Sequence, residues 1–385
     1  MLKCKRSSFS LPRNVAYLNC AYMSPILKDT EKAGVRAVRR KRNPLDITPR
    51  DFFTESDLLR AEFAKLINVK DSTRVAIIPS VSYGIATVAK NLNISRGQNI
   101  IVAGEQFPSN YYSWQALAEE NGANLKSIAP EKTTTDRGKK WNEKILSEIN
   151  ADTRAVAIPH THWADGTKFQ LAEIRKRTRE VGALLIIDGT QSVGALPFDV
   201  QEIQPDALIC AGYKWLLGPY SIGLAYFGEH FNDGKPLEEN WINRSDSENF
   251  SGLVNYQHAY QPGALRYEVG EHSNFILVPM LLKSIAQLNR WGVDNVQKYC
   301  ESITEDSIEH LRNFGCWIEE KEFRGSHLIG VRLPDIEKME IVKQSLVKNN
   351  IHVSYRGDAI RVAPNVYNTE AQMRKFTKVV SAAIK

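Results

Sequence analysis

A lysine and an aspartate that follow two short apolar runs are the residues best suited to covalent chemistry. Residues 184–187 (LLII) lead directly into Asp188, and residues 207–210 (ALIC) lead through Ala-Gly-Tyr to Lys214. Uninterrupted apolar runs of this length are typical of strands that are covered on both faces in a largely parallel sheet. The carboxyl ends of such strands form the edge at which open α/β sheets bind ligands. The pattern therefore predicts an amine and a carboxylate side by side at a ligand-binding edge.

This pair of side chains suits one kind of cofactor chemistry. A lysine that sheds its proton can form a Schiff base with a carbonyl group. A carboxylate can keep the ring nitrogen of pyridoxal phosphate (PLP) protonated, which makes the ring an electron sink. The alternative is an ordinary salt bridge at the strand ends, and for an isolated Asp and Lys it would be preferred.

The residues around the pair favour the cofactor. Residues 187–194 (IDGTQSVG) and 212–219 (GYKWLLGP) resemble the signature of the class V aminotransferase family, which also contains cysteine desulfurases, selenocysteine lyases, kynureninases and isopenicillin-epimerase-like proteins. The resemblance covers nearly the whole chain in the family's order and implies an α/β fold, fold type I of the PLP-dependent transferases. It also implies that Lys214 forms the Schiff base, that Asp188 contacts the pyridine nitrogen and that Gln191 lies near the ring hydroxyl oxygen.

A serine-rich turn is the candidate phosphate site. Residues 80–84 (SVSYG) follow the apolar residues 75–78 and lead into a helix that is predicted over 85–92. Free N–H groups and the helix dipole favour an anion at a helix start. The resemblance implies that Ser82 and the Tyr83 backbone contact the phosphate, whereas the sequence alone is equally typical of a simple serine cap.

Two aromatic residues match other cofactor positions of the family. Phe107 stands where many members have a histidine stacked on the cofactor ring, and it resembles the Phe-Pro-Ser element of kynureninase-like members. An aromatic face is sufficient for stacking, but the loss of the histidine removes a possible acid–base group and disfavours a cysteine desulfurase. Tyr213 stands where relatives have a histidine or tyrosine that touches the phosphate.

Three segments are expected to supply the substrate contacts. Residues 361–369 (RVAPNVYNT) resemble the family's final signature, which implies that Arg361 holds the substrate carboxylate in a two-pronged contact. A surface arginine on an edge strand is the alternative, and Arg356 is a second candidate for the contact. Tyr22 is expected to line the substrate pocket or simply to pack. Trp163 replaces the asparagine that several relatives place beside the ring oxygen, so it is expected to shape the substrate pocket.

The resemblance also implies a homodimer. Residues 266–274 (RYEVGEHSN) resemble a segment that reaches the partner's phosphate across the interface. The usual Gly-Thr-Pro is replaced here by Gly-Glu-His, so Ser273 or Asn274 is the substitute candidate for the missing threonine contact.

The pattern of elements predicts an N-terminal arm (1–16), a large PLP-binding domain (17–274) with a mostly parallel mixed sheet, and a smaller C-terminal α+β domain (275–385). Within these, residues 131–140 are polar and predict an exposed loop before a helix over 141–149. A short strand is predicted over 316–318.

Composition excludes several other classes. The chain has 385 residues, a formal net charge of +6 and five cysteines without paired short spacing, which argues against a disulfide framework or a zinc site. His160 and His162 have no third ligand nearby, so no metal is expected. The basic run 39–42 is interpreted as a solvated helix face and not as a nucleic-acid site. No apolar stretch or signal core indicates a membrane, and the expected location is the cytoplasm.

The sequence thus predicts a PLP-dependent aminotransferase that acts on an amino acid, with a keto acid as a possible second substrate. A kynureninase-like, cysteine-sulfinate or selenocysteine lyase is the first alternative. Persulfide-forming desulfurases carry a cysteine on the loop before the substrate arginine, and residues 353–361 contain none. A non-catalytic PLP-binding protein is the second alternative, and it would not need both an electron sink and a carboxylate contact.

Overall fold

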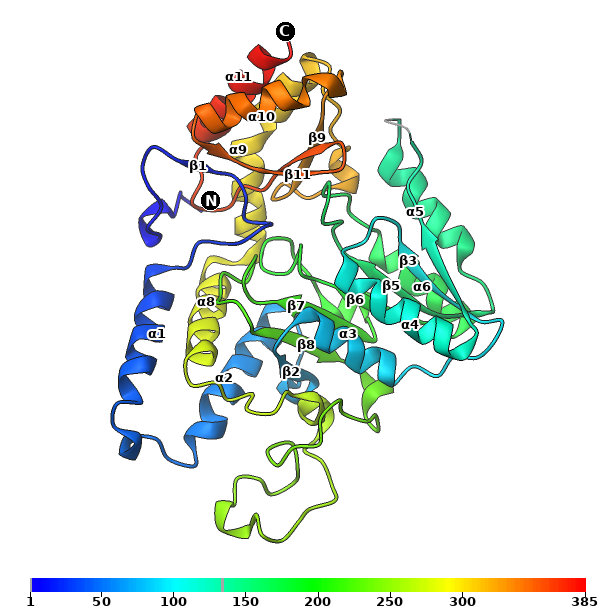
Figure 1. Cartoon of the computed structure of the whole chain (residues 1–385), viewed down its shortest axis with the longest axis vertical. Coiled ribbons are helices and arrows are strands. Elements are labelled where there is room, and N and C mark those ends of the chain that lie inside the picture. Colours follow the sequence, from blue (N-terminus) through cyan, green and yellow to red (C-terminus); the bar gives the residue numbers. More distant parts are fainter. Residues whose placement is uncertain (1, 133–134) are drawn as a thin grey trace.

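A seven-stranded sheet forms the centre of the molecule in this computed structural model, which describes residues 2–132 and 135–385 (Figure 1). Its strand order is β2-β8-β7-β6-β5-β3-β4. β8 runs antiparallel to both of its neighbours, and the other neighbouring pairs are parallel. The predicted mostly parallel mixed sheet is confirmed. The strands are β2 (Val75–Ile78), β3 (Asn99–Ala103), β4 (Asn124–Ile128), β5 (Thr153–Pro159), β6 (Leu184–Asp188), β7 (Ala207–Ala211) and β8 (Gly223–Phe227).

Helices cover both faces of this sheet, because the side chains of each strand alternate between two apolar cores. Leu208 and Cys210 of β7 enter one core, and Ala207 and Ile209 enter the other. One face is covered by α3 (Val81–Lys90) and α4 (Tyr112–Asn121). The other face is covered by α2 (Asp51–Leu66), α5 (Arg137–Glu148), α6 (Leu171–Val181) and α8 (Leu277–Trp291), with the short α7 (Val200–Ile203) between β6 and β7.

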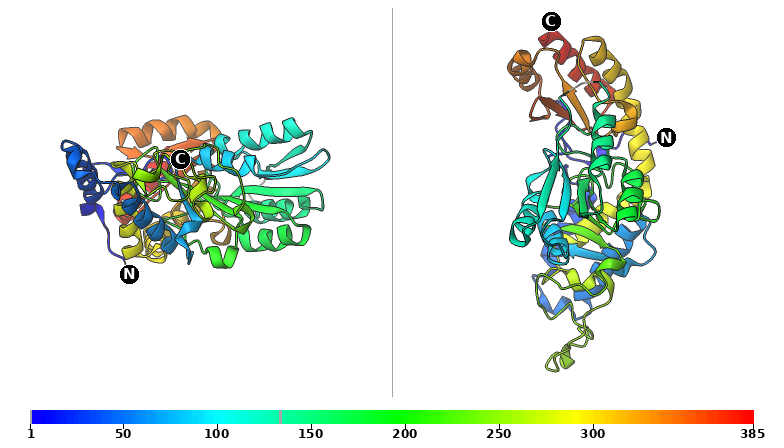
Figure 2. Two further views of the ribbon diagram at one scale, coloured as in Figure 1. Left: turned by 90° about the horizontal axis from the view of Figure 1, so that it is seen from below. Right: turned by 90° about the vertical axis from the view of Figure 1, so that its right-hand side faces the viewer.

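A smaller antiparallel sheet belongs to the C-terminal part of the chain, at the top of Figure 1 and at the top of the right-hand view in Figure 2. Its strand order is β11-β12-β9, and helices pack against it. These elements are β9 (Ile329–Arg332), β11 (Ser354–Arg356), β12 (Ala359–Val362), α9 (Val293–Asn313), α10 (Met339–Lys348) and α11 (Glu370–Ala383). The α+β character predicted for this region is therefore present.

Two sets of contacts cross the proposed domain boundaries at 17 and 275, which stay a prediction. β1 (Ala16–Tyr17) pairs in parallel with β10 (Ile351–His352), so the start of the chain lies on the small domain. At the other boundary, α8 packs against α2 and against α1 (Lys28–Arg40) of the large domain. α9, which follows α8 directly, packs instead against α11.

Three local predictions differ from the structure. The helix predicted from residue 85 begins at Val81, because the Ser80 hydroxyl accepts a hydrogen bond from the Tyr83 N–H and caps it (3.2 Å). The helix predicted from residue 141 begins at Arg137, which is buried; residues 133–134 of the predicted loop lie outside the described residues. The strand predicted over 316–318 is reduced to one bridge between Trp317 and Arg332. No described helix is long and apolar enough to cross a membrane.

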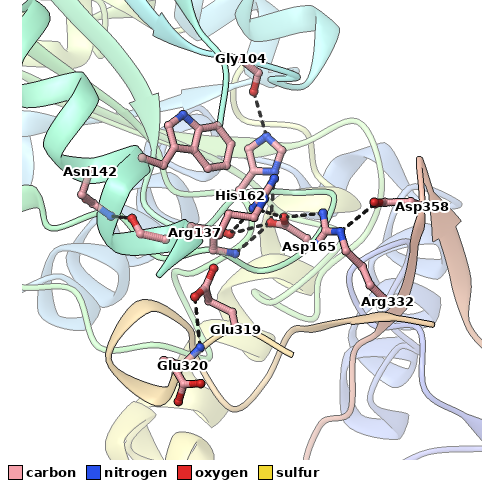
Figure 3. Close-up of polar contacts among 12 residues, drawn as sticks. Gly104, Arg137, Asn142, His162, Asp165, Glu319, Glu320, Arg332 and Asp358 are labelled. Carbon is pink, nitrogen blue, oxygen red and sulfur yellow. Dashed lines mark hydrogen bonds and ion pairs between the residues drawn. The ribbon is translucent and has the colours of Figure 1, made fainter. Parts of the chain in front are cut away.

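A buried ionic cluster joins the two domains (Figure 3). The Asp165 carboxylate, at 3% exposure, accepts hydrogen bonds from Arg137 of α5 (2.7 Å) and from Arg332 of β9 (3.1 Å). The His162 Nδ1 lies 3.4 Å from the same carboxylate. Burial alone would raise the pKa of Asp165, but the His162 contact and the two arginine charges hold it well below its usual range.

Candidate active site

A cavity of about 260 Å³ opens where β6 and β7 end and α3 begins. It lies at the carboxyl ends of parallel strands, where open α/β sheets bind ligands. Seven of the residues selected from the sequence line it: Ser82, Phe107, Trp163, Asp188, Gln191, Tyr213 and Lys214. The fold therefore brings together side chains from five separate segments of the chain. Tyr22, Tyr83 and Arg361 do not line this cavity.

Asp188 and Lys214 form the buried floor of the cavity. Asp188 is the last residue of β6, and Lys214 follows the end of β7 by three residues; their exposures are 7% and 6%. Burial lowers the pKa of Lys214 to about 8, although the negative charge of Asp188 opposes this shift. Burial likewise raises the pKa of Asp188, although hydrogen bonds from Thr190 oppose the change. An amine that is partly neutral near physiological pH is suited to nucleophilic attack on a carbonyl.

Thr190 is a site residue that sequence reasoning missed. Its N–H donates to Asp188 Oδ1 (2.9 Å), and its hydroxyl accepts from the Ala211 N–H (3.3 Å). Thr190 therefore links the ends of β6 and β7 and fixes the Asp188 carboxylate. The sequence signal for this role was its position two residues after Asp188 at the end of a strand. In a short turn, an N–H group at that position can donate a hydrogen bond to the aspartate carboxylate.

The start of α3 forms one end of the cavity. Ser80, Val81 and Ser82 line it, and the Ser80 and Ser82 hydroxyls are 2.9 Å apart. The Tyr83 N–H, which was expected to meet the phosphate, already donates to the Ser80 hydroxyl. The first N–H groups of the helix, at Val81 and Ser82, are therefore better placed for an anion than that of Tyr83.

Aromatic rings form the wall opposite the floor. Phe107 and Trp163 meet edge to face, with ring centroids 5.4 Å apart. The Lys214 Nζ lies 5.4 Å from the Phe107 ring centroid and 5.5 Å from that of Tyr213. The Trp163 indole N–H donates to the Glu105 carbonyl (2.7 Å), which fixes the ring. Phe107 therefore lies near the amine of Lys214, and its stacking on a cofactor ring stays a prediction.

Gln191 is held in place by its neighbours. Its side-chain oxygen accepts from the Trp215 indole N–H (2.9 Å), and its side-chain nitrogen donates to the Ala21 carbonyl (3.1 Å). Of the side-chain groups, the second amide hydrogen is therefore the one left to meet a ring oxygen. Tyr22, next to Ala21, is 56% exposed, and the segment is anchored where the Ser24 N–H donates to the Tyr213 carbonyl (3.1 Å).

Arg361 comes from β12 of the small domain and is 1% exposed. Its Nη1 donates to the Trp163 carbonyl (2.7 Å), which brings it to the side of the cavity that Trp163 lines. No ion pair with an acid is formed by Arg361 in the described part of the chain. Burial, and then the positive charge of Arg356, lowers the pKa of Arg361 to about 9. A buried guanidinium without an acidic partner is suited to an anionic ligand.

Residues 266–274 were expected to lie near a partner's phosphate. Within the single chain, Asn274 of this segment caps the start of α8. Asn274 Oδ1 accepts from the N–H groups of Ile276 (3.1 Å) and Leu277 (2.9 Å) at the start of α8. Ser273 is buried. The His272 Nε2 lies 3.2 Å from Glu268, which also accepts from Arg60 (2.7 Å), so the residues that replace Gly-Thr-Pro belong partly to a buried ionic cluster.

The two histidines of residues 159–167, His160 and His162, are buried and have internal contacts. His162 lies in the interdomain cluster, and its Nε2 is 3.2 Å from the Gly104 carbonyl. His160 packs edge to face against Phe198. Residues 2–132 and 135–385 contain no group of three or more His, Cys, Asp or Glu side chains arranged to hold a metal ion.

Known proteins resemble this chain in sequence and in fold. The family model described as aminotransferase class V matches residues 50–378. The chain belongs to the class V aminotransferase family. A curated relative, an uncharacterised aminotransferase of Bacillus subtilis (strain 168), is 27% identical over 329 residues, which is 85% of this chain and 84% of the relative.

Solved structures show the same fold. The apo cysteine desulfurase of Thermococcus onnurineus NA1 superposes with a TM-score of 0.83 at 19% identity and covers 100% of this chain and 99% of its own. A lysine-to-alanine mutant of the cystine C–S lyase C-DES, with glycine covalently linked to its PLP cofactor, superposes with a TM-score of 0.85 at 18% identity and covers 98% and 99% of the two chains. The fold is therefore that of the PLP-dependent enzymes of fold type I, and PLP is the cofactor of this class V chain.

The cavity residues fit this cofactor. Asp188 is a buried carboxylate without a cationic partner within ion-pair distance in the described part of the chain, which suits a protonated ring nitrogen. Lys214 lies beside it as the amine, and the start of α3 offers N–H groups to a phosphate. Phe107 offers a ring for stacking.

Proposed function

We propose that this enzyme is a PLP-dependent aminotransferase that acts on an amino acid through Lys214. The observation that carries the proposal is the buried amine and carboxylate in one cavity, with the unpaired guanidinium of Arg361 beside it. An electron sink and a carboxylate contact are together what an amino-acid enzyme needs. A non-catalytic PLP-binding protein would need neither the buried Asp188 nor Arg361.

Each residue has a distinct task in this proposal. When bound, PLP supplies the electron sink that stabilises negative charge at the substrate Cα. Lys214, whose pKa burial lowers to about 8, would hold the cofactor through its Nζ and, once free of it, would accept and return the Cα proton at that atom. Asp188 accepts a hydrogen bond from the protonated ring nitrogen. Arg361 binds the α-carboxylate and so orients the amino acid.

The contacts of the cavity end support the cofactor part of the proposal. Ser82 and the start of α3 line one end of the cavity and would hold the phosphate, with Tyr213 beside it. Phe107 would offer its ring for stacking, and the Gln191 amide would donate to the ring oxygen. Trp163, which lines the cavity, would shape the substrate side; Tyr22 is exposed and lies outside the cavity lining, so its part in the substrate pocket rests on the family resemblance alone.

A lyase is the second candidate. The solved structures that match include a cysteine desulfurase and a cystine C–S lyase, and Phe107 is shared with kynureninase-like proteins. The hairpin that leads to the substrate arginine carries no thiol, because it turns at Gly357 and Asp358 between β11 and β12. Cys20, Cys210, Cys300 and Cys316 are buried, and the exposed Cys4 has its Sγ 3.7 Å from the Asn368 carbonyl. The lyase form of the proposal is therefore one that needs no catalytic cysteine.

A homodimer in the cytoplasm completes the proposal. Ser273 or Asn274 would approach the partner's phosphate site. Because the Asn274 oxygen caps α8, its amide nitrogen is the atom that would make such a contact. The oligomeric state is measured by light scattering of the purified protein, and a stable monomer that is active would contradict this part.

The deciding experiment incubates the PLP-loaded protein with single amino acids and follows both cofactor and products. Conversion of the cofactor to pyridoxamine phosphate, with release of a keto acid, supports the aminotransferase. Multiple turnovers that cleave a side-chain bond and leave PLP unchanged support the lyase. Borohydride reduction and peptide mapping should place the cofactor label on Lys214. Lys168→Ala is the matched control and should keep that label, because Lys168 is a half-buried lysine outside the cavity. A label on another lysine would contradict the assignment.

A further inference from the structure

Two arginines of the small domain project from one face of the β11–β12 hairpin. Ser354 pairs with Arg361 and Arg356 pairs with Ala359 across this antiparallel hairpin. Cross-strand partners share a face, as do residues two apart on a strand, so Arg356 and Arg361 lie diagonally on the same face. Both guanidinium carbons approach the Trp163 ring, at 5.2 Å and 6.0 Å from its centroid.

Neither charge is neutralised by an acid. Arg356 Nη1 donates to the Tyr355 carbonyl (2.6 Å) and Arg361 Nη1 to the Trp163 carbonyl (2.7 Å). Across residues 2–132 and 135–385, no carboxylate lies within ion-pair distance of either guanidinium. Asp358, the acid in the hairpin turn, is bonded instead to Arg332 (2.8 Å). Two like charges on one face, with most of their N–H groups free, favour an anion with more than one acidic group.

Both arginines act on the catalytic lysine. Burial is the largest cause of the lowered pKa of Lys214, and the charge of Asp188 opposes it. The positive charges of Arg361 and then Arg356 come next, and both lower this pKa further. Trp163, which both guanidinium groups face, lines the same cavity as Lys214. The pair of arginines is therefore close to the reacting end of the cavity and not on a remote surface.

We propose that Arg356 binds an acidic group on the substrate's side chain while Arg361 binds the α-carboxylate, so that the substrate is an amino acid with a side-chain carboxylate or sulfinate. This inference rests on the proposed function. The diagonal placement separates the two Cα atoms by about 7–8 Å, which leaves room for two acidic groups a few bonds apart. The planar fork of each arginine suits a carboxylate or a sulfinate equally, because both present two oxygens.

The test uses non-reacting ligands, so it does not depend on turnover. Succinate and butyrate both have four carbons, but succinate carries two carboxylates and butyrate carries one. Each is titrated calorimetrically into PLP-loaded protein. We expect succinate to bind roughly ten- to a hundred-fold more tightly, since one additional charge-assisted contact has that effect on Kd. Arg356→Gln should abolish this difference and leave the Kd for butyrate within about three-fold. Arg374→Gln is the control, because Arg374 is an exposed arginine of the same domain that pairs with Glu370.

Two results would overturn the inference. One is equal binding of succinate and butyrate by the unmodified enzyme. The other is an equal loss of both ligands in Arg356→Gln, which would show that both arginines hold the same carboxylate or that the hairpin has changed shape. Cofactor absorbance of the variant reports on its folding, and Arg356→Lys, which keeps the charge, should retain part of the preference for succinate.

An amino-acid screen separates this inference from the proposed function. Turnover fastest with aspartate, glutamate or cysteine sulfinate supports both. Turnover fastest with a neutral amino acid overturns the acidic side chain and leaves the aminotransferase or lyase in place. Absence of turnover with every amino acid contradicts the proposed function, whereas the succinate preference would still show the two-anion site.

Discussion

Glu319→Gln should make the stability of this protein much less dependent on pH. Glu319 is 3% exposed and lies at the junction of the two domains (Figure 3). A Cβ added to Gly138 of α5 would lie 2.9 Å from its Oε2, and its Oε1 accepts from the Glu320 N–H (3.1 Å). Burial, reinforced by the negative charge of Asp165 and opposed by the Glu320 N–H, raises the pKa of Glu319 from 4.5 to about 7.

The sign and size of the effect follow from this shift. Between the two pKa values the native state binds more protons than the unfolded state, so the free energy of unfolding falls as pH rises from 4.5 towards 7 and stays low above it. At 1.36 kcal/mol per unit, the ionised form costs on the order of 3 kcal/mol above neutral pH. Glutamine keeps the shape and has no charge to lose, so its advantage should grow by about 2 kcal/mol between about pH 5 and about pH 8.

Chemical denaturation of the PLP-loaded protein at these two pH values measures the difference. Glu320→Gln is the matched control, because it removes one negative charge from the adjacent residue, whose side chain is 63% exposed and pairs with Arg312 on the surface. An advantage of Glu319→Gln that is the same at both pH values, or a loss of stability near pH 8, would refute the reasoning.

The remaining predictions concern the site. The rate at which the apoprotein captures PLP should rise with pH around a midpoint near 8, because burial lowers the pKa of Lys214 and the neutral amine reacts; a midpoint near 10 would contradict this. Asp188→Asn should keep the cofactor but lower kcat by roughly a hundred-fold or more, since the ring nitrogen is no longer held protonated, and near-normal turnover would show that the electron sink is misplaced. Arg361→Lys should raise KM for amino acids roughly ten- to a hundred-fold with unchanged cofactor absorbance, and an unchanged KM would place the carboxylate contact elsewhere.

The strand-end chemistry could be predicted from the sequence because its signals are local. An apolar run that ends in Asp188, and another that leads to Lys214, mark two strands whose carboxyl ends meet in any parallel sheet. The same local signals were ambiguous at the start of α3, where two serines compete to cap the helix. The structure shows that Ser80 is the cap, so the free N–H groups lie earlier than predicted.

Contacts between residues far apart in the chain could not be predicted in this way. Arg332 reaches Asp165 across 167 positions, and β1 joins β10 although more than three hundred residues separate them. No periodicity marks such pairs, because each partner looks like an ordinary surface charge or a short apolar segment in its own context. For the same reason the sequence could not assign a buried environment to Glu319.

The position of the two arginines shows why the domain junction matters for the chemistry. Asp188 ends β6 of the large sheet and Lys214 follows β7, whereas Arg356 and Arg361 lie on strands of the small sheet, so in the proposed function the substrate contacts elements of both sheets. The contact of Asp165 with Arg332, one strand away from Arg361, fixes this spacing with a buried ionic pair and not with apolar packing alone. A charge pair of this kind has stricter distance and direction requirements than apolar contact. In the proposed function, the junction therefore sets how far Arg361 lies from Lys214, and this distance determines which amino acids are held in a reactive position.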